Sequence, residues 1–238
     1  MKKKIDLSPN YSKKSRLKSD IKFVIIHYTG MQSEIESINR LKNPKFSVSC
    51  HYLINKKGLI IQMVSDKKIA WHAGQSKWKN FNNLNSHSIG IELTNKGHEF
   101  GYENYPNTQI KSLIYLCQKL KKKYKIKSEN FLGHSDIAPT RKVDPGERFP
   151  WKKLSKFKIG NWCKTKEIKI QILRKNWRLS FFKNIYKIGY RYFNLNKINK
   201  KDQIIIKAFQ RRYLPNNISG KIDKKTLRFS YLLANLNK

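Results

Sequence analysis

Acidic side chains are scarce in this chain of 238 residues, which has 15 Asp and Glu against 52 Lys and Arg and a formal net charge of +37. Such a charge predicts attraction to polyanions, whether nucleic acid, an anionic envelope polymer or a membrane surface. The lysines are spread through loops and both termini, as an A/T-rich genome would also produce. A nucleic-acid binder would instead gather cations on one face among aromatic side chains. We therefore give the charge little weight and expect no specific nucleic-acid partner.

Cysteine and long apolar runs are also scarce. The three cysteines, Cys50, Cys117 and Cys163, lie far apart and form no CxxC pair, so neither a disulfide framework nor a cysteine-based structural zinc site is indicated. No stretch approaches the ~20 apolar residues of a transmembrane helix. The N-terminus begins MKKKIDLSPN and lacks the apolar region of a signal peptide. As written, the chain is expected to stay in the cytoplasm, unless its true start lies upstream or export uses another route.

What is present is enough for a folded core, since 39% of the residues are hydrophobic and 12% aromatic. Ile21–Ile26 and Ser88–Thr94 are short apolar runs typical of strands that are covered on both faces. Two further runs flank Asn55–Gly58 and predict a β-hairpin. Helices are expected over Ser33–Lys42, which starts with a typical N-cap residue, and over the amphipathic Asn107–Lys125. The pattern indicates the α/β class.

The segment Phe131–Trp151, FLGHSDIAPTRKVDPGERFPW, combines polar side chains with three prolines. Proline removes a backbone donor and biases the preceding residue toward extended geometry, so we predict a stiff loop without regular helix. His134 follows a short apolar run and is expected at the end of a strand. His134 and Asp144 suit a divalent metal, but a catalytic zinc site needs three protein ligands and an open position. Alternatively, His134 caps the strand and the acids pair with nearby Arg and Lys.

Two more polar side chains stand at or near the ends of predicted strands. His27 directly follows an apolar run and would point into the crevice where α/β proteins bind ligands. Glu92 lies inside another run, where an unused carboxylate is unfavourable and burial would raise its pKa toward the range of a general base. With His134 and Asp144, His27 completes a set of three metal ligands. Glu92 is then available as a base, and Lys142 as a cation beside the metal.

Other histidines are less clear. His51 alternates with Tyr52 in a predicted strand and is interpreted as a packed histidine or one that supports a ligand. His72 lies in Ala70–Gly74, an aromatic loop suited to lining a cleft. A role in touching substrate and a structural role both remain open for His72, because short motifs have a high false-positive rate.

These residues lie in segments that resemble a known family, the zinc-dependent N-acetylmuramoyl-L-alanine amidases of the branch shared with peptidoglycan recognition proteins. The matching segments are SPNY, VIIHYTG, HYLI, WHAG, SIGIEL and GHSDIAPTRKVDPG, in the family's order over most of Ser8–Trp151. The resemblance implies a mixed sheet with helices on its faces. It also implies hydrolysis of the amide bond between N-acetylmuramic acid and L-alanine in peptidoglycan or muropeptides.

The resemblance implies roles for individual residues. The ligands of Zn²⁺ would be His27, His134 and Asp144. Glu92 would activate the water and Lys142 would steady the oxyanion. The residues at cleft-lining positions are Tyr28, Trp71, His72 and Asn95. A recognition protein of the same fold without turnover is the alternative, and the presence of all three ligands disfavours it.

The remaining sequence differs in character. We predict a basic N-terminal arm over 1–20, the zinc amidase domain over 21–160 and a small all-α, three-helix module over 161–238. The pattern KAFQRRYLP…ISGKIDKKT resembles a three-helix peptidoglycan-binding module. The alternative is a helical extension that packs on the catalytic domain. Beyond peptidoglycan or muropeptides, anionic envelope polymers are partners that the charge would favour.

Overall fold

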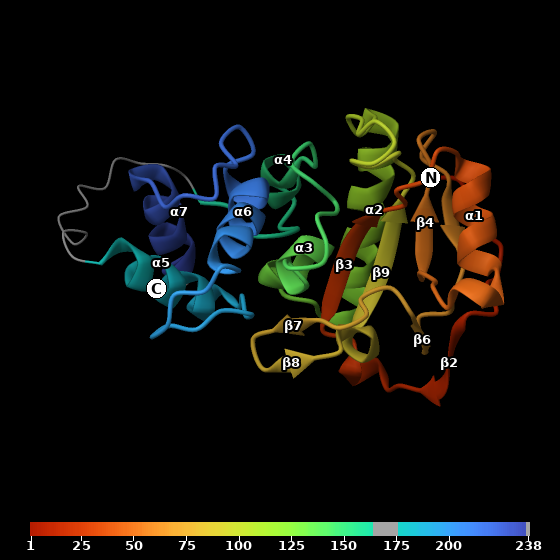
Figure 1. Cartoon of the computed structure of the whole chain (residues 1–238). Helices are drawn as coiled ribbons and strands as arrows, with labels where there is room; N and C mark the ends of the chain where they lie inside the picture. Colours follow the sequence, from red (N-terminus) through yellow and green to blue (C-terminus); the bar gives the residue numbers. More distant parts are fainter. Residues whose placement is uncertain (164–175, 237–238) are drawn as a thin grey trace.

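The computed structural model describes residues 1–163 and 176–236. Its centre is a six-stranded mixed sheet in the order β1-β5-β4-β9-β3-β10 (Figure 1). All neighbouring strands in this sheet are parallel except β4 and β5. The bounds are β1 Lys3–Ile5, β3 Phe23–Tyr28, β4 Tyr52–Ile54, β5 Ile60–Gln62, β9 Ser88–Leu93 and β10 Phe131–Gly133. The predicted mixed sheet is confirmed.

The central strands carry the apolar runs seen in the sequence. Val24, Ile25 and Ile26 of β3 have no exposed surface, as expected for a parallel strand covered on both faces. The predicted hairpin joins β4 and β5, where the Gly58 N–H donates to the carbonyl of Asn55 over 2.9 Å. Gly58 has φ +83°, a left-handed conformation that glycine adopts without steric cost.

Two helices pack on opposite faces of the sheet. α1, Glu34–Lys42, begins after Ser33, whose hydroxyl accepts the Glu36 N–H over 3.1 Å. Its Leu41 packs in a cluster with sheet residues such as Leu53. α2, Asn107–Tyr124, packs its apolar side on the opposite face, and each Ile or Leu fully buried there contributes about 1.5–3 kcal/mol. Both predicted helices are confirmed.

Shorter elements complete the chain. Two small antiparallel sheets pair β2 with β6 and β7 with β8. Their bounds are β2 Tyr11–Ser15, β6 Lys68–Ala70, β7 Lys77–Trp78 and β8 Phe81–Asn82. Single 3-10 turns occur at η1 Lys18–Asp20, η2 Pro44–Phe46, η3 Leu84–His87 and η4 Ser128–Asn130. None of the helices in the described ranges has the length and apolar character needed to cross a membrane.

The N-terminal twenty residues differ from the predicted arm, because β1 and β2 both pair with strands of the domain. The side chain of Arg16 is buried and donates to the carbonyl of Ser88 over 2.7 Å. It also lies 2.7 Å from Nε2 of His51, which is packed in the interior. A polar edge strand gives no hydrophobic signal in the sequence, since it pairs through its backbone.

The segment Phe131–Trp151 contains a helical turn that the prediction excluded. α3, His134–Ile137, ends before the first proline of the segment, Pro139. The carboxylate of Asp136 accepts the Gly133 N–H over 2.7 Å at its start, which satisfies a donor that a helix leaves free there. A second short helix, α4, Trp151–Ser155, begins at the end of the segment.

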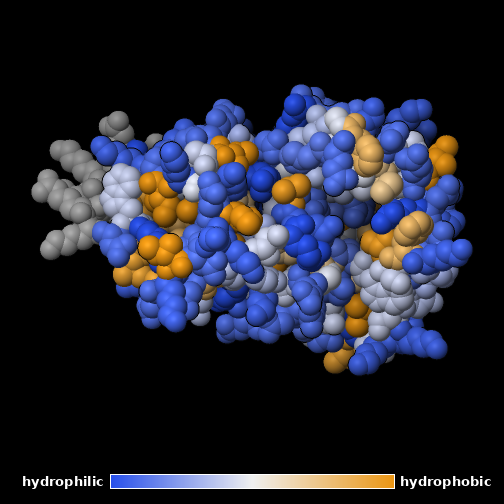
Figure 2. Space-filling model, viewed as in Figure 1, coloured by the Kyte–Doolittle hydropathy of each residue, from blue (hydrophilic) through white to orange (hydrophobic). Residues whose placement is uncertain are grey.

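Three helices follow in the described part of the C-terminal segment: α5 Trp177–Ile188, α6 Asp202–Tyr213 and α7 Lys224–Ala234. They lie together beside α3 (Figure 1). Their aromatic side chains share one apolar cluster with Phe23 and Ile25 of β3 and with Ile137 of α3. The helices therefore cover part of the sheet, and residues 164–175 of the predicted module lie outside the described residues. Hydrophilic side chains dominate the face drawn in Figure 2, with hydrophobic patches over these helices.

Candidate metal centre

Neighbouring parallel strands bring two histidines together. Residues alternate along β3, so His27 lies on the same face as Phe23 and Ile25, and at the end of their apolar cluster. β10 pairs with β3 in parallel, Gly133 opposite Ile26. His134 therefore emerges at the same edge of the sheet as His27, and the stiff loop that follows returns Asp144 to them.

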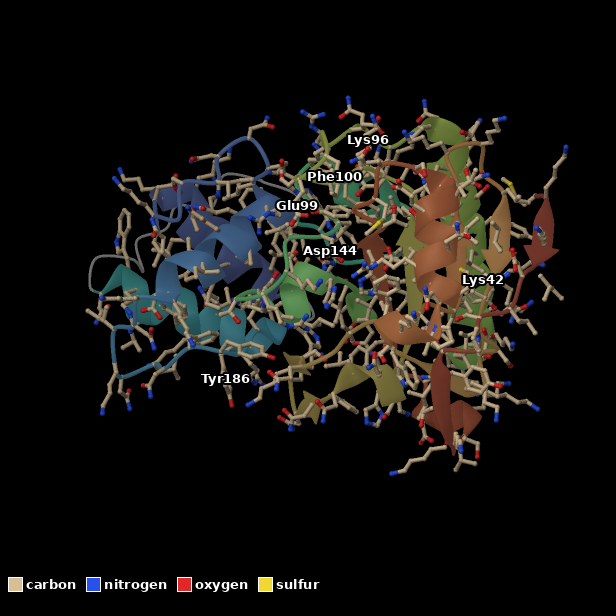
Figure 3. The ribbon with its side chains drawn as sticks, turned by 45° about the vertical axis from the view of Figure 1, so that its right-hand side comes forward. Lys42, Lys96, Glu99, Phe100, Asp144 and Tyr186 are labelled. Carbon is tan, nitrogen blue, oxygen red and sulfur yellow. The ribbon has the colours of Figure 1, made fainter. Side chains whose placement is uncertain are left out.

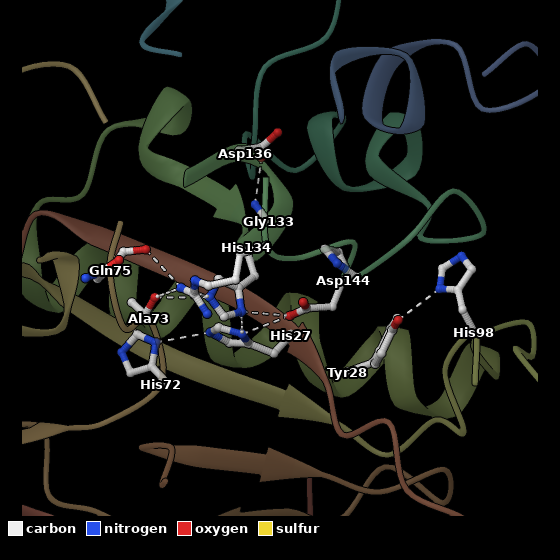
Figure 4. A network of polar contacts seen from close by, with 12 residues as sticks. His27, Tyr28, His72, Ala73, Gln75, His98, Gly133, His134, Asp136 and Asp144 are labelled. Carbon is white, nitrogen blue, oxygen red and sulfur yellow. Dashed lines mark hydrogen bonds and ion pairs between the residues drawn. The ribbon is translucent and has the colours of Figure 1, made fainter. Parts of the chain in front are cut away.

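The donor atoms of these three side chains form a tight triangle (Figure 4). Nδ1 of His27 lies 3.0 Å from Nδ1 of His134 and 3.0 Å from Oδ2 of Asp144. The third edge, from Nδ1 of His134 to Oδ2 of Asp144, is 3.2 Å. Tetrahedral zinc with ligands at 2.0–2.1 Å would separate its donors by about 3.3–3.4 Å. The three edges are only a few tenths of an ångström shorter than these separations. The site therefore fits zinc after a small outward movement of the donor atoms.

The charge states of His27 and Asp144 also suit a metal. Burial lowers the pKa of His27 to about 4, with a further contribution from His134, so this imidazole is neutral at pH 7. Burial alone would raise the pKa of Asp144, but its contacts with His134 and His27 hold that pKa well below its usual range. Neutral imidazole and ionised carboxylate are the forms that ligate divalent metals.

Each imidazole is held from behind by its other nitrogen. Nε2 of His134 lies 3.1 Å from the carbonyl oxygen of Ala73. Nε2 of His27 lies 3.1 Å from Nδ1 of His72. Because Nδ1 of His27 faces the triangle, its Nε2–H is the donor in that contact. Such partners fix the orientation and tautomer of a metal-binding imidazole.

The support of His27 continues into the core. Nε2 of His72 lies 3.3 Å from the hydroxyl of Ser88, which itself donates to the carbonyl of Leu84 over 2.6 Å. Burial, followed by the neighbouring histidines, lowers the pKa of His72 well below its usual range, so it stays neutral. A Cβ at Gly90 would lie 2.3 Å from Cγ of His72, and glycine is therefore required beside this ring. The structure places His72 behind His27, and His72 also lines the cavity that contains the triangle.

Replacing His72 by alanine is expected to weaken zinc binding by about 10–100-fold, because His27 loses the acceptor that orients it. Zinc affinity would be measured by competition with a chromophoric chelator. His87→Ala serves as the control, since His87 packs against the Phe81 ring outside this network and should keep the parental affinity. An unchanged zinc affinity in the folded His72 variant would show that His27 needs no such support.

Glu92 lies beside the triangle on β9. It is opposite His27 in the parallel pairing of β3 with β9, so both side chains project from the same face. Its Oε2 is buried and has no hydrogen-bond partner among the described residues. Burial, followed by the negative charge of Asp144, raises the pKa of Glu92 to about 8. Glu92 thus has the perturbed pKa of a proton-transfer group in a cleft.

The triangle and Glu92 line one cavity of about 540 Å³. Lys142 lines it as well, and its positive charge favours ionised Glu92 and disfavours protonated His27. Tyr28 lines the wall, with its hydroxyl 2.9 Å from Nδ1 of His98. Figure 3 shows Lys96, Glu99 and Phe100 above Asp144 in that view. The residues expected to do chemistry are thus brought together.

Two predicted cleft residues are placed elsewhere. Asn95 is buried, and its side chain accepts the Gly97 N–H over 3.0 Å and donates to the carbonyl of Glu103 over 2.9 Å. It braces the loop that carries the cavity residues Lys96 and His98 but does not line the cavity itself. Trp71 does not line the cavity either. Its backbone N–H donates to the hydroxyl of Ser49 over 2.9 Å.

Sequence reasoning missed a polar pair at the rim. Nε2 of His98 lies 3.1 Å from Oε2 of Glu147, and the His98 ring stacks on Tyr102 with centroids 4.4 Å apart. His98 comes from the polar stretch KGHEF, which has neither apolar periodicity nor a motif. A pairing between such loops, 49 residues apart in sequence, leaves no local signal.

Comparison with known proteins gives a consistent set of matches. The profile of a family described as N-acetylmuramoyl-L-alanine amidase matches residues 17–147. The N-acetylmuramoyl-L-alanine amidase AmiD of Escherichia coli (strain K12) is 33% identical over 223 residues, covering 87% of this chain and 79% of the relative. The 1,6-anhydro-N-acetylmuramyl-L-alanine amidase AmpD of Haemophilus influenzae is 32% identical over 164 residues, covering 61% and 86%.

Solved structures extend the similarity through the C-terminal helices. Escherichia coli AmiD in complex with the substrate anhydro-N-acetylmuramic acid-L-Ala-D-gamma-Glu-L-Lys has a TM-score of 0.81 and 29% identity, and the match covers 96% of this chain and 93% of AmiD. AmpDh3 from Pseudomonas aeruginosa has a TM-score of 0.81 and 27% identity, with 96% and 97% covered. A structure of AmpD matches 66% of this chain with a TM-score of 0.56.

Proposed function

The chain belongs to the N-acetylmuramoyl-L-alanine amidase family, and from that premise we propose that it hydrolyses soluble anhydro-muropeptides with a zinc ion held by His27, His134 and Asp144. The bond cleaved by such an amidase joins N-acetylmuramic acid to the L-alanine of the stem peptide. One observation carries the proposal: a buried triangle of donor atoms at 3.0–3.2 Å shares a cavity with the carboxyl group of Glu92, one oxygen of which has no partner in the described part of the chain. The anhydro-muropeptides bound to AmiD and AmpDh3 support this substrate class.

Zinc in this site would supply activation of a water molecule and polarisation of the scissile carbonyl. Glu92 transfers the protons. Burial raises the pKa of Glu92 to about 8, and the positive charge of Lys142 favours its ionised form. In that form the carboxylate takes a proton from the attacking water, and the protonated group then returns one to the leaving nitrogen of L-alanine. The C–N bond breaks, a carboxylate remains on the lactyl group and the peptide leaves with a free α-amine.

Lys142 acts on the carbonyl oxygen of the scissile amide. That oxygen gains negative charge when water adds to the carbonyl carbon, and a cation in a partly enclosed cavity stabilises that charge. Lys142 lines the cavity with His27, His134 and Asp144. Its role is stabilisation of the developing oxyanion.

The cavity rim suits an acidic stem peptide. Side chains that line the cavity include the cations Arg40, Lys96 and Arg141. The guanidinium of Arg141 is fixed, because it donates to the carbonyls of Ala73 and Gln75 over 2.8 and 2.9 Å. Positive charge around a cleft raises the local concentration of an anionic substrate. The binding of anionic envelope polymers by the wider surface stays a prediction.

Incubation with a soluble anhydro-muropeptide is expected to release anhydro-N-acetylmuramic acid and a peptide whose first residue is L-alanine with a free amine. Mass spectrometry of the products identifies the cleaved bond. Parallel incubation with purified sacculi compares the polymer with the soluble substrate, and we expect faster turnover of the soluble one. Glu92→Gln is the matched blank. Tight binding of muropeptide without any product would favour the recognition-protein alternative, and faster release from sacculi would contradict the proposed substrate class.

A further inference from the structure

Two adjacent arginines of α6 contact the segment Phe131–Trp151. One contact lies near His134 and the other near Asp144. Arg212 pairs with Asp136, which lies in α3 two residues after the ligand His134. Arg211 lies 3.8 Å, from its Nε to Oε2, from Glu147, three residues after the ligand Asp144. The helix that carries them belongs to the C-terminal segment, which the sequence assigned to a separate module.

Arg212 contacts both the first and the last residue of the segment Phe131–Trp151. Its guanidinium is buried, and Nη2 donates to the carbonyl of Phe131 over 3.1 Å. The same group lies 3.9 Å above the ring of Trp151. Phe131 and Trp151 are the first and last residues of the loop that carries His134 and Asp144. A planar guanidinium can bind a carboxylate, a carbonyl and an aromatic face at once, which a lysine cannot.

Asp136 links Arg212 to the turn that presents the proposed metal ligand His134. Its Oδ2 accepts the Gly133 N–H over 2.7 Å and so caps the turn whose first residue is His134. Its Oδ1 accepts the hydroxyl of Tyr190 over 2.5 Å. Tyr190, which directly follows α5 and its closing Gly189, is fully buried. The carboxylate that shapes the His134 turn thus contacts two residues of the C-terminal segment, Arg212 and Tyr190.

We infer that α6 is a positioning element of the metal site. Arg212, with Tyr190, fixes Asp136 and thereby the turn that presents His134. The C-terminal helices are then required for metal binding and are not a detachable module. This inference rests on the proposed zinc site. Removing one partner of the buried pair leaves the other charge uncompensated, so the turn should shift when Arg212 is lost.

The full-length Arg212→Gln variant is expected to bind zinc at least about tenfold more weakly, as is typical when support beyond the ligands is lost. Competition with a chromophoric chelator measures the affinity, and kcat/KM on a soluble muropeptide should fall with it at a free zinc concentration that saturates the parent but not the variant. Arg178→Gln is the matched control. Arg178 pairs with Asp202 at 2.6 Å and also contacts the carbonyls of Leu195 and Asn194 and the ring of Phe182, all in the C-terminal segment. It should lower the Tm without changing zinc affinity.

Milder variants keep the test decisive if Arg212→Gln does not fold. Tyr190→Phe removes one hydroxyl, and Arg212→Lys keeps the charge but loses the planar contacts. Both are expected to weaken zinc binding, by less than Arg212→Gln. Parental zinc affinity in the folded Tyr190→Phe and Arg212→Lys variants would overturn the inference. A parental chain that binds no zinc would instead contradict the proposed metal site itself, so the two failures are distinguishable.

Discussion

Replacing Glu92 by glutamine is expected to lower kcat by about 10²–10⁴-fold, the range typical of a lost general acid–base group. Glutamine keeps the shape of the side chain but can neither accept the proton of water nor deliver one to the leaving amine. Glu92 lies on the strand next to His27 and lines the same cavity. Steady-state hydrolysis of a soluble anhydro-muropeptide measures the effect. Zinc content measured on the same preparation should stay at the parental level.

Stability against pH provides the control for a folding defect in this variant. In the metal-free parent, Glu92 has a pKa raised from 4.5 to about 8. The folded chain therefore holds a proton that the unfolded chain loses, and stability falls as pH rises between those values, by up to about 1.4 kcal/mol per pH unit. Urea unfolding at pH 5 and pH 8 with chelator should show a smaller loss for Glu92→Gln. Hydrolysis at the parental rate by this variant would make Glu92 structural.

Much of the site was accessible from the sequence because each key residue interrupts or ends an apolar run. His27 directly follows the apolar run of β3 and Glu92 lies within that of β9, and in both cases a polar group stands where apolar residues are expected. Strand ends in parallel sheets share one edge, so the convergence with His134 could be inferred before any coordinates. The residues alone suggested a metal ligand at Asp144 and a cation at Lys142, and the resemblance to the family then implied their roles in the reaction.

The supports of the site could not be predicted in the same way. The contact between His27 and His72 depends on Gly90, where a Cβ would lie 2.3 Å from the His72 ring. A glycine within an apolar run does not indicate which ring approaches it. Asn95 matched a cleft position, yet its amide is used within its own loop. Local motifs identify residue types, whereas the partner of a polar side chain is set by tertiary packing.

The C-terminal segment shows the same limit on a larger scale. The sequence predicted a three-helix module over 161–238, but amphipathic helices of a free module and of a packed extension have the same pattern. The pairing of Arg212 with Asp136 joins residues 76 apart in sequence, and no local rule relates them. The helices share an apolar cluster with the sheet, as the packed-extension alternative expected. Their binding of peptidoglycan stays a prediction.

Removal of zinc is expected to abolish hydrolysis completely and reversibly. The purified chain should hold about one zinc ion, because His27, His134 and Asp144 are the group of three clustered metal-binding side chains among the described residues. Elemental analysis gives the stoichiometry, and activity is measured after dialysis against a chelator and again after zinc is returned. Without the ion, neither water activation nor carbonyl polarisation remains, and Glu92 alone supplies only part of the rate.

Asp144→Asn tests the same site by changing a proposed ligand instead of removing the ion. Asparagine keeps the volume of the side chain but removes the charge that neutralises the metal, so zinc content and activity should fall together. Asp202→Asn is the matched control, because Asp202 is also a buried carboxylate in an ion pair, with Arg178, far along the chain in the C-terminal helices. It should keep its zinc at temperatures below its Tm. Full activity in a metal-free preparation of the parent, or full zinc content in Asp144→Asn, would exclude this triangle as the catalytic metal site.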